Sequence, residues 1–338
     1  MPHGAENSDW QNTWPWSCIA RSAEDSASGA PTLDLGMVAS SPSWRPGQGN
    51  ERFERGTTRA GSLDLARLRA VSTGGGHVRE AHMSLRDPNV SNPKKPKRIA
   101  IVISNPAVST TTGWPVGFWW SELTHPYYLL TEQGYEVEVF SPRGGQCEAD
   151  ALSDPRDPSG YSSTDLITMG FIATPRLAAL VDGTRRASEL NVDDFDGIIV
   201  AGGQAPMFTY EGEVELQRKF VQFFEAGKIA AALCHGLALL RYTRLGNGQP
   251  LVKGRTVTGF ANVEEDFADE AVWSMNLLAR DKHVMPWRIE DELGKLGANY
   301  VQAGRWRGFA VRDGNLVTGQ QNFSGAETAE LVVATLGV

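Results

Sequence analysis

The sequence predicts an α/β fold, in which a doubly wound, mostly parallel sheet carries helices on both faces. Short apolar runs alternate along the chain with segments of helical spacing. These runs are nearly continuous, which is typical of parallel strands that are covered on both sides. In such sheets a functional site lies beyond the carboxyl ends of the strands. Gly202, Gly203 and Cys234 are expected at those ends.

The first half of the predicted sheet contains three strands and two helices. Each helix is followed by a glycine in the position that ends a helix, Gly134 and Gly227. The strands are expected over residues 98–104, 135–141 and 196–201, and the helices over residues 121–133 and 213–226.

Between the second and third predicted strands lies a long polar segment, residues 142–190. It is rich in turn signals, such as Asp154-Pro155 and the stretch 157–160. We expect this segment to form short helices and to overhang the site.

A short apolar strand, a cysteine and a helix-like run follow one another at residues 229–240. Small residues, Ala232 and Gly236, flank Cys234. This is the pattern of a nucleophile elbow, in which a tight turn between strand and helix presents the reactive side chain. A helix N-terminus favours the thiolate form of such a cysteine. The alternative is a buried, inert cysteine, but the turn and the adjacent His235 favour a functional thiol.

The last third of the chain completes the alternation. Residues 257–260 are interpreted as a further strand, followed by the acidic run 264–266. Two short apolar runs flank Asp313-Gly314-Asn315, which is a strong hairpin signal. A helix over residues 288–296 that ends at Gly297, strands over 309–312 and 316–319, and a closing helix over 325–336 are therefore expected.

Composition excludes several classes of function. The chain has 338 residues and a net charge of −8, so nothing favours binding to nucleic acid or to an anionic membrane. No apolar run is long enough to span a membrane. Cys18, Cys147 and Cys234 form no CxxC pair, which suits a reducing compartment, and we expect the protein to be cytoplasmic. Without paired histidines or a GxGxxG motif, no metal and no nucleotide cofactor is predicted.

The N-terminal quarter differs from the rest in composition. Residues 1–92 are rich in Ser, Gly, Arg and Pro and have little periodicity, so they are predicted to be a disordered or weakly ordered leader. The ordered domain is expected over residues 93–338. Met83 is an alternative translation start. The basic run 94–98 is interpreted as a solvated lead-in to the first strand, with a nuclear-import patch as the alternative.

Three motifs together resemble a known family. They are the elbow Ala232-Leu233-Cys234-His235-Gly236, the glycine-containing segment 202–208, and Glu122 with His125-Pro126. Their order and spacing resemble the DJ-1/PfpI (ThiJ/PfpI) superfamily, from about Lys97 to the C-terminus. The segment 142–190 and the stretch 258–265 resemble its larger branch of chaperones and glutathione-independent glyoxalases.

That resemblance implies a flavodoxin-like sandwich, which is a domain of the class I glutamine amidotransferase-like type. It also implies an enzyme that needs no cofactor and a chain that often forms a homodimer. The sequence departs from the family pattern at Gln204-Ala205, where a Gly-His-Gly or similar is usual. It also departs at Gly236-Leu237, where Gly-Pro is frequent. These departures bear on the substrate more than on the fold.

The resemblance implies a nucleophile and a general acid/base. Cys234 is the expected nucleophile, and Glu122 is the carboxyl that the family pattern directs toward it. The apolar residues at 118–120 and 123 suggest that Glu122 is buried rather than exposed on its helix. A buried carboxyl beside a thiol can share a proton with it, which raises the pKa of the acid.

The family pattern also gives His235 an acidic partner. By its distance from Gly259-Phe260 this partner is Glu265, with Glu264 and Asp266 as alternatives. Developing negative charge on a substrate oxygen would be met by backbone N–H groups.

The expected donors are the N–H groups of Gly203 and His235, next to Gly202. His125 lies on the same helical face as Glu122, either as a substrate contact or as a core or capping histidine.

Three functions remain open. The first is a glyoxalase that converts methylglyoxal or a related small reactive carbonyl to a 2-hydroxy acid through a hemithioacetal on Cys234. The second is a cysteine hydrolase or amidase that uses Cys234, His235 and Glu265. The third is a stress chaperone or redox sensor in which Cys234 is only oxidised. A glutamine amidotransferase is disfavoured, because its later His-x-Glu is missing: His283 is followed by Val284-Met285.

Overall fold

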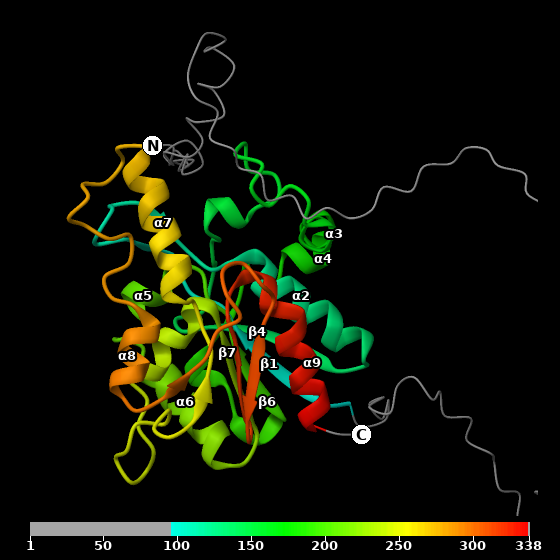
Figure 1. Cartoon of the computed structure of the whole chain (residues 1–338). Coiled ribbons are helices and arrows are strands. Elements are labelled where there is room, and N and C mark those ends of the chain that lie inside the picture. The colour runs from blue at the N-terminus through cyan, green and yellow to red at the C-terminus, as the bar shows by residue number, and fades with distance from the viewer. Residues whose placement is uncertain (1–95, 337–338) are drawn as a thin grey trace, which may run out of the picture. The chain divides into compact units, whose positions relative to one another are not determined.

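The computed structural model describes residues 96–336. The predicted leader, with Cys18 and Met83, lies outside these residues. A seven-stranded sheet forms the centre of the described chain (Figure 1). Its strands are β1 (Arg98–Val102), β4 (Glu136–Ser141), β5 (Arg185–Arg186), β6 (Gly197–Val200), β7 (Ile229–Leu233), β10 (Ala310–Asp313) and β11 (Leu316–Gly319).

The strand order confirms a doubly wound sheet. The order is β10-β11-β7-β6-β1-β4-β5, so the chain moves outward from β1 in both directions. All neighbouring strands are parallel except the hairpin of β10 and β11. The carboxyl ends of β6 and β7 are therefore adjacent, and the chain leaves them at Ala201 and Cys234.

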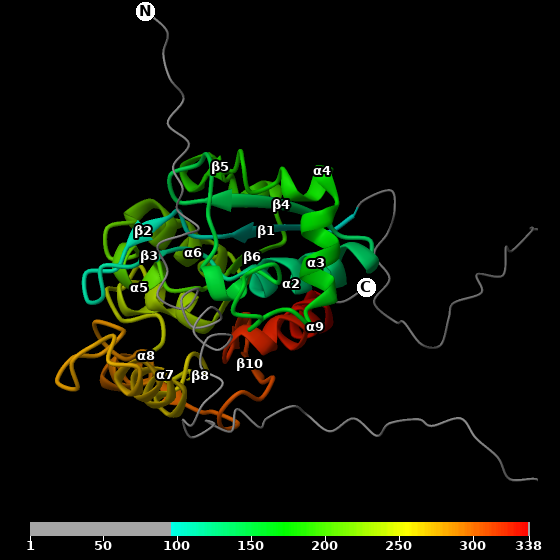
Figure 2. The same ribbon diagram turned by 90° about the horizontal axis from the view of Figure 1, so that it is seen from above.

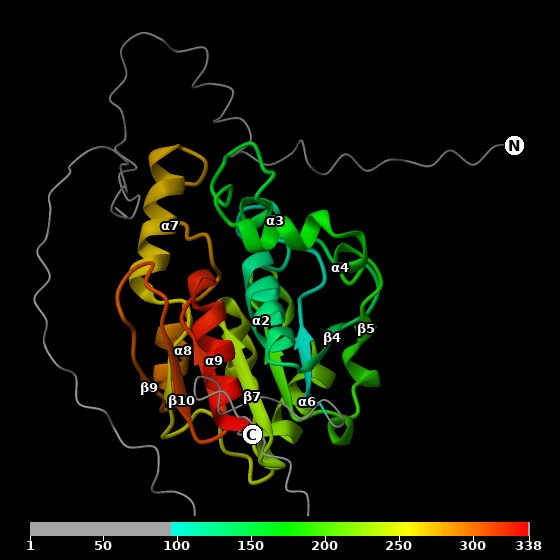
Figure 3. The same ribbon diagram turned by 90° about the vertical axis from the view of Figure 1, so that its right-hand side faces the viewer.

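Helices cover both faces of this sheet. One face carries α2 (Trp120–Glu132) and α9 (Gly325–Leu336), which lie side by side (Figures 1 and 3). The other face carries α6 (Val214–Glu225), α8 (Ile289–Lys295) and the 3₁₀ helix η5 (Cys234–Arg241). The remaining described α-helices are α3 (Leu166–Ala173), α4 (Pro175–Ala178), α5 (Pro206–Thr209) and α7 (Asn262–Ser274). The remaining described strands are β2 (Ala107–Val108), β3 (Pro115–Val116), β8 (Thr256–Val257) and β9 (Asn299–Tyr300).

The central strand shows why the apolar runs are continuous. Ile99 and Ile101 of β1 pack into the core layer under α2 and α9. Ala100 and Val102, which alternate with them, pack into the layer under α6. Because both faces are buried from Ile99 to Val102, only Arg98, at the half-buried start of the strand, is polar.

The segment 142–190 forms short helices, as predicted, together with an edge strand that was not predicted. Its helices are α3 and α4, and its strand β5 pairs with the end of β4. Arg185 and Arg186 form β5 without any apolar pattern, because an exposed edge strand does not require one. Figure 2 shows α7 and α8 at the other end of the sheet from β4 and β5.

Two predicted elements differ from the structure. The run after Cys234 is a 3₁₀ helix rather than an α-helix. The strand predicted over residues 257–260 is only β8, which pairs with β9 outside the main sheet. It stops early because the N–H of Thr258 donates to the hydroxyl of Thr318 at 2.9 Å instead of to a strand. None of the described helices is long and apolar enough to cross a membrane.

Candidate active site

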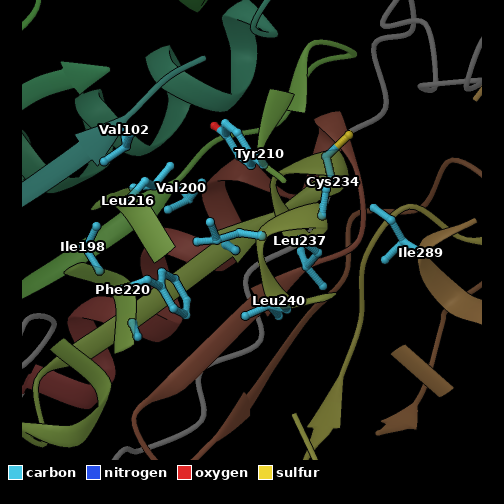
Figure 4. Packing of buried hydrophobic residues seen from close by; sticks show 14 of the residues in the cluster. Val102, Ile198, Val200, Tyr210, Leu216, Phe220, Cys234, Leu237, Leu240 and Ile289 are labelled. Carbon is cyan, nitrogen blue, oxygen red and sulfur yellow. The ribbon is translucent and has the colours of Figure 1, made fainter. Parts of the chain in front are cut away.

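Cys234 occupies a strained turn at the end of β7. Its φ of 57° lies in the left-handed region, which non-glycine residues rarely adopt. Two residues later, a Cβ on Gly236 would approach the carbonyl oxygen of Val200 to 2.6 Å, so only glycine fits there. Figure 4 shows the sulfur pointing away from Val200 and Phe220 in the core. This is the geometry of a nucleophile elbow.

Glu122, in the first turn of α2, is fully buried beside this cysteine. Its Oε2 accepts the N–H of Gly202 at 2.6 Å, and its Oε1 has no hydrogen-bond partner among the described residues. Burial raises its pKa to about 8, although the Cys234 side chain and the Gly202 N–H lower it. A carboxyl that holds its proton near neutral pH is suited to general acid/base work.

The Cys234 thiol does not have the lowered pKa that the sequence suggested. Burial raises the pKa well above its usual value, and the charge of Glu122 raises it further. The expected helix N-terminus is a 3₁₀ turn, and desolvation outweighs its effect. When Glu122 holds its proton, the repulsion disappears, and the N–H groups of His235 and Gly203 remain to stabilise a thiolate.

Those two N–H groups lower the pKa of the Cys234 thiol, so both lie near the sulfur. Gly203 has a φ of 97°, and a Cβ there would lie 2.5 Å from the carbonyl oxygen of Gly117. A Cβ on Gly202 would lie 2.8 Å from the backbone nitrogen of His235. Both glycines are therefore required for the close approach of the two loops.

His235 joins the nucleophile to an acid. Its Nδ1 lies 3.6 Å from the Cys234 sulfur, and its Nε2 lies 3.0 Å from Oε1 of Glu265. The ring stacks on Phe260 with centroids 4.2 Å apart, which fixes its plane. If Nε2 carries the proton and donates it to Glu265, the lone pair of Nδ1 faces the thiol.

The other two acids of the run have different partners. Glu264 accepts the N–H of Trp306 at 3.0 Å and an amide N–H of Gln320 at 2.9 Å. Asp266 pairs with Arg288 at 2.6 Å. Of the three candidates, Glu265 is the one that contacts the histidine.

His125 is not brought to the nucleophile by any contact in the described structure. Its Nε2 lies 2.9 Å from Oδ1 of Asp165, whose side chain caps the N-terminus of α3 through the N–H of Thr168. The ring thus joins α2 to α3. This contact fits the structural alternative for His125, and the expected substrate contact stays a prediction.

Two residues near the site were missed in the sequence because neither belongs to a motif. Asp150 is buried, and its two oxygens accept N–H groups from Gly117 and Gln204. Tyr161 contacts Trp119 edge-on at 6.1 Å. Both come from the turn-rich segment 142–190, in which the sequence does not show which residue turns inward.

The electrostatic surroundings of Tyr161 place it near the nucleophile. Burial raises the pKa of Tyr161, and so do the negative charges of Cys234 and Glu264. The residue is 48% exposed, so solvent screens part of these effects. Among the described residues, no group of three or more His, Cys, Asp or Glu side chains could hold a metal ion.

Comparisons with known proteins agree with this geometry. "Glyoxalase 3" of Candida albicans is 29% identical over 231 residues, which are 66% of this chain and 90% of that protein. "Glutathione-independent glyoxalase HSP31" of Saccharomyces cerevisiae is 27% identical over 245 residues, which are 69% of this chain and 95% of that protein.

Solved structures are similar as well. Rapid Encystment Protein 24 KDa of Francisella tularensis matches with a TM-score of 0.62 and 26% identity, over 72% of this chain and 100% of that one. Glyoxalase III of Candida albicans matches with a TM-score of 0.58 and 27% identity, over 71% of this chain and 97% of that one. The DJ-1/PfpI family model matches residues 116–335, which contain the elbow, Glu122 and both glycines. The chain therefore belongs to the DJ-1/PfpI family.

Proposed function

We propose that this protein is a glutathione-independent glyoxalase, which converts methylglyoxal or related 2-oxoaldehydes to 2-hydroxy acids. The observation that carries the proposal is the buried pair of Cys234 and Glu122. It combines a nucleophile with a carboxyl whose pKa is raised by burial to about 8. Two relatives whose names are those of glyoxalases add support.

Free, buried thiols at Cys147 and Cys234 suit a reducing compartment, and we propose the cytoplasm.

The first step of the proposed reaction is addition of the thiol to the aldehyde. A bond forms between the Cys234 sulfur and C1, and the thiol proton ends on the former aldehyde oxygen, giving a hemithioacetal. His235, whose Nδ1 faces the sulfur, carries that proton. Negative charge on the oxygen is met by the N–H groups of Gly203 and His235.

The second step moves hydrogen between two carbons. Ionised Glu122 removes the proton from C1 while the C2 carbonyl oxygen takes up a proton, which gives an enediol. Glu122 then returns its proton to C2, and the C1 hydroxyl loses its proton and becomes the carbonyl of the thioester. The product is a 2-hydroxyacyl thioester on Cys234. Water attacks this thioester, the C–S bond breaks, and the free thiol and the 2-hydroxy acid are released. The sum is addition of one water to the oxoaldehyde, so no redox cofactor is consumed.

An assay without glutathione tests this proposal. Purified protein and methylglyoxal should give lactate, measured by enantiospecific enzymatic detection, and Cys234→Ala should abolish turnover. Cys147→Ala is the matched control, because Cys147 is also buried but lies against Thr184 and Asn105. Turnover that survives in Cys234→Ala, or lactate formation that requires glutathione, would contradict the proposal.

A cysteine hydrolase remains the second candidate, and one observation favours it. His235 lies between Cys234, at 3.6 Å, and Glu265, at 3.0 Å. This is the order of a nucleophile–base–acid triad. Incubation with a panel of small esters and amides tests this. Hydrolysis that needs His235 and Glu265 but not Glu122 would favour this candidate over the glyoxalase.

A further inference from the structure

Asp150 is a buried carboxylate for which the proposed chemistry has no use. It is 1% exposed and lies in the segment that follows β4. Its Oδ1 accepts the N–H of Gly117 at 2.8 Å, and its Oδ2 accepts the N–H of Gln204 at 2.6 Å. No cationic side chain is among the groups that set its pKa. A buried carboxylate without a cation is costly, so its two N–H partners must compensate for the lost hydration.

The two partners of Asp150 belong to the two segments that build the active site. Gly117 lies just before α2, which carries Glu122. Gln204 directly follows Gly203, whose N–H faces the Cys234 sulfur. The Asp150 side chain therefore links two segments. One leads to the general acid Glu122, and the other carries the oxyanion donor of Gly203.

These segments are in close contact, so a shift of one displaces the other. The N–H of Ala205 donates to the carbonyl of Gly117 at 3.1 Å, and the N–H of Trp119 donates to the carbonyl of Gly202 at 3.3 Å. The backbone of Asp150 takes part as well, since its N–H donates to the carbonyl of Phe118 at 2.7 Å.

We propose that Asp150 is a positioning residue of the active site. By accepting the N–H groups of Gly117 and Gln204 together, its carboxylate holds the Gly203 N–H on the Cys234 sulfur. The carboxyl suits this task in its ionised form, which prevails above its pKa of about 7. Both of its oxygens then accept hydrogen bonds, whereas an amide offers one acceptor and one donor. Asp150 acts through its neighbours and touches no reacting atom.

Turnover of methylglyoxal by Asp150→Asn, made in the full chain, is the first test, and it rests on the proposed function. The variant keeps the size of the side chain but places an amide NH₂ against one of the two N–H groups. We expect kcat to fall about 10- to 100-fold, while KM stays within about twofold of the value for the unmodified protein. The reason is that oxyanion donors act mainly in the transition state. A rise in KM alone would overturn the proposal.

The matched control is Asp154→Asn in the same segment. The carboxylate of Asp154 pairs with Arg156 at 2.7 Å near the surface, outside the active site. Its kcat and KM should remain those of the unmodified protein. Equal losses in Asp150→Asn and Asp154→Asn would show a general effect on the segment and would overturn the positioning role.

Alkylation of Cys234 by iodoacetamide is the second readout, and it does not depend on the reaction catalysed. Without a fixed Gly203 N–H the thiolate is less stable, so alkylation of Asp150→Asn at about pH 8 should be about threefold slower, equivalent to about half a pKa unit. If methylglyoxal is not turned over, the proposed function fails, yet slower alkylation would still support Asp150. Equal alkylation rates would overturn its role even where turnover is present.

A measurement on the unmodified chain covers the case in which Asp150→Asn does not fold. Amide hydrogen exchange should show protection of the Gly117 and Gln204 N–H groups, because each is bound to a buried acceptor. Exchange of the Gln204 amide as fast as that of an exposed loop would overturn the proposal.

Discussion

At the scale of single residues, the site depends on two acidic groups that burial makes reluctant to ionise. Burial raises the pKa of Glu122 to about 8 and raises the pKa of Cys234 as well. Each charge also disfavours the other, so the pair prefers one shared proton to two negative charges. Once the sulfur is bonded to the substrate, the repulsion between the two charges disappears, and Glu122 can take up and return the proton that moves between the two carbons.

Replacement of the carboxyl tests the proton shuttle. Glu122→Gln preserves size but cannot transfer a proton, so glyoxalase kcat should fall by roughly 10²- to 10⁴-fold, the usual contribution of general acid/base catalysis. Hemithioacetal formation needs only the thiol, so intact mass spectrometry should still detect an aldehyde adduct on Cys234. Near-normal turnover in Glu122→Gln, with an inactive His235→Ala, would instead favour the hydrolase triad.

Thiol reactivity should separate the two described cysteines. Burial raises the pKa of Cys147, as it does for Cys234, but Cys234 also has the N–H groups of Gly203 and His235 to stabilise its thiolate. Limited peroxide treatment followed by peptide mass spectrometry should therefore find oxidation first at Cys234. Preferential oxidation of Cys147 would contradict the functional role assigned to the elbow.

At the scale of elements, those with regular patterns could be predicted from the sequence. The strand Ile229–Leu233 and the helix Gly325–Leu336 have the predicted bounds, because an apolar run and glycine or asparagine turns delimit them. Elements without a pattern could not be predicted. The strand β5 consists of two arginines, and β9 of Asn299 and Tyr300, so tertiary pairing rather than local preference forms them.

The same distinction applies to the site. The elbow, the glycine pair and Glu122 were predictable because their spacing follows a motif. Asp150 was not, since its importance arises from two backbone N–H groups that are distant in sequence. The family resemblance favoured Glu265 over Glu264 and Asp266. The run of three acids alone does not reveal the orientation of α7, which brings Glu265 to His235.

The tight turn of the elbow predicts a difference between two glycines. In Gly236→Ala the new Cβ would lie 2.6 Å from a backbone carbonyl oxygen, so unfolding should become easier by about 1–3 kcal/mol, as for other overpacked sites. In Gly294→Ala, within α8, nothing lies within 4 Å of the new Cβ. That control should gain up to about 1 kcal/mol from helix propensity.

Chemical denaturation followed by circular dichroism measures both variants. If Gly236→Ala is as stable as the unmodified protein, the close approach of η5 to the end of β6 is not a constraint on the elbow. Loss of stability in Gly294→Ala would contradict the open surroundings of that position.

At the scale of the whole molecule, the buried carboxyls of the site should make the free energy of unfolding depend on pH. Burial raises the pKa of Glu122 from 4.5 to about 8 and that of Asp150 from 3.8 to about 7. At a pH between the unfolded and the folded pKa of each carboxyl, the folded protein keeps a proton that the unfolded chain has released. Raising the pH therefore favours unfolding, and the contribution of these carboxyls is full below about pH 4 and is lost as the pH rises through 7 and 8.

Urea denaturation at a series of pH values from about 5 to 9 tests this directly. The free energy of unfolding should decrease with pH over that range, and the double variant Glu122→Gln, Asp150→Asn should flatten the curve, because neither amide titrates. Glu215 is a useful contrast, since its hydrogen bond with Arg218 lowers its pKa and the arginine stays charged over this pH range. Glu215→Gln should therefore leave the slope above pH 5 unchanged. A slope that persists in the double variant would show that groups other than Glu122 and Asp150 cause it.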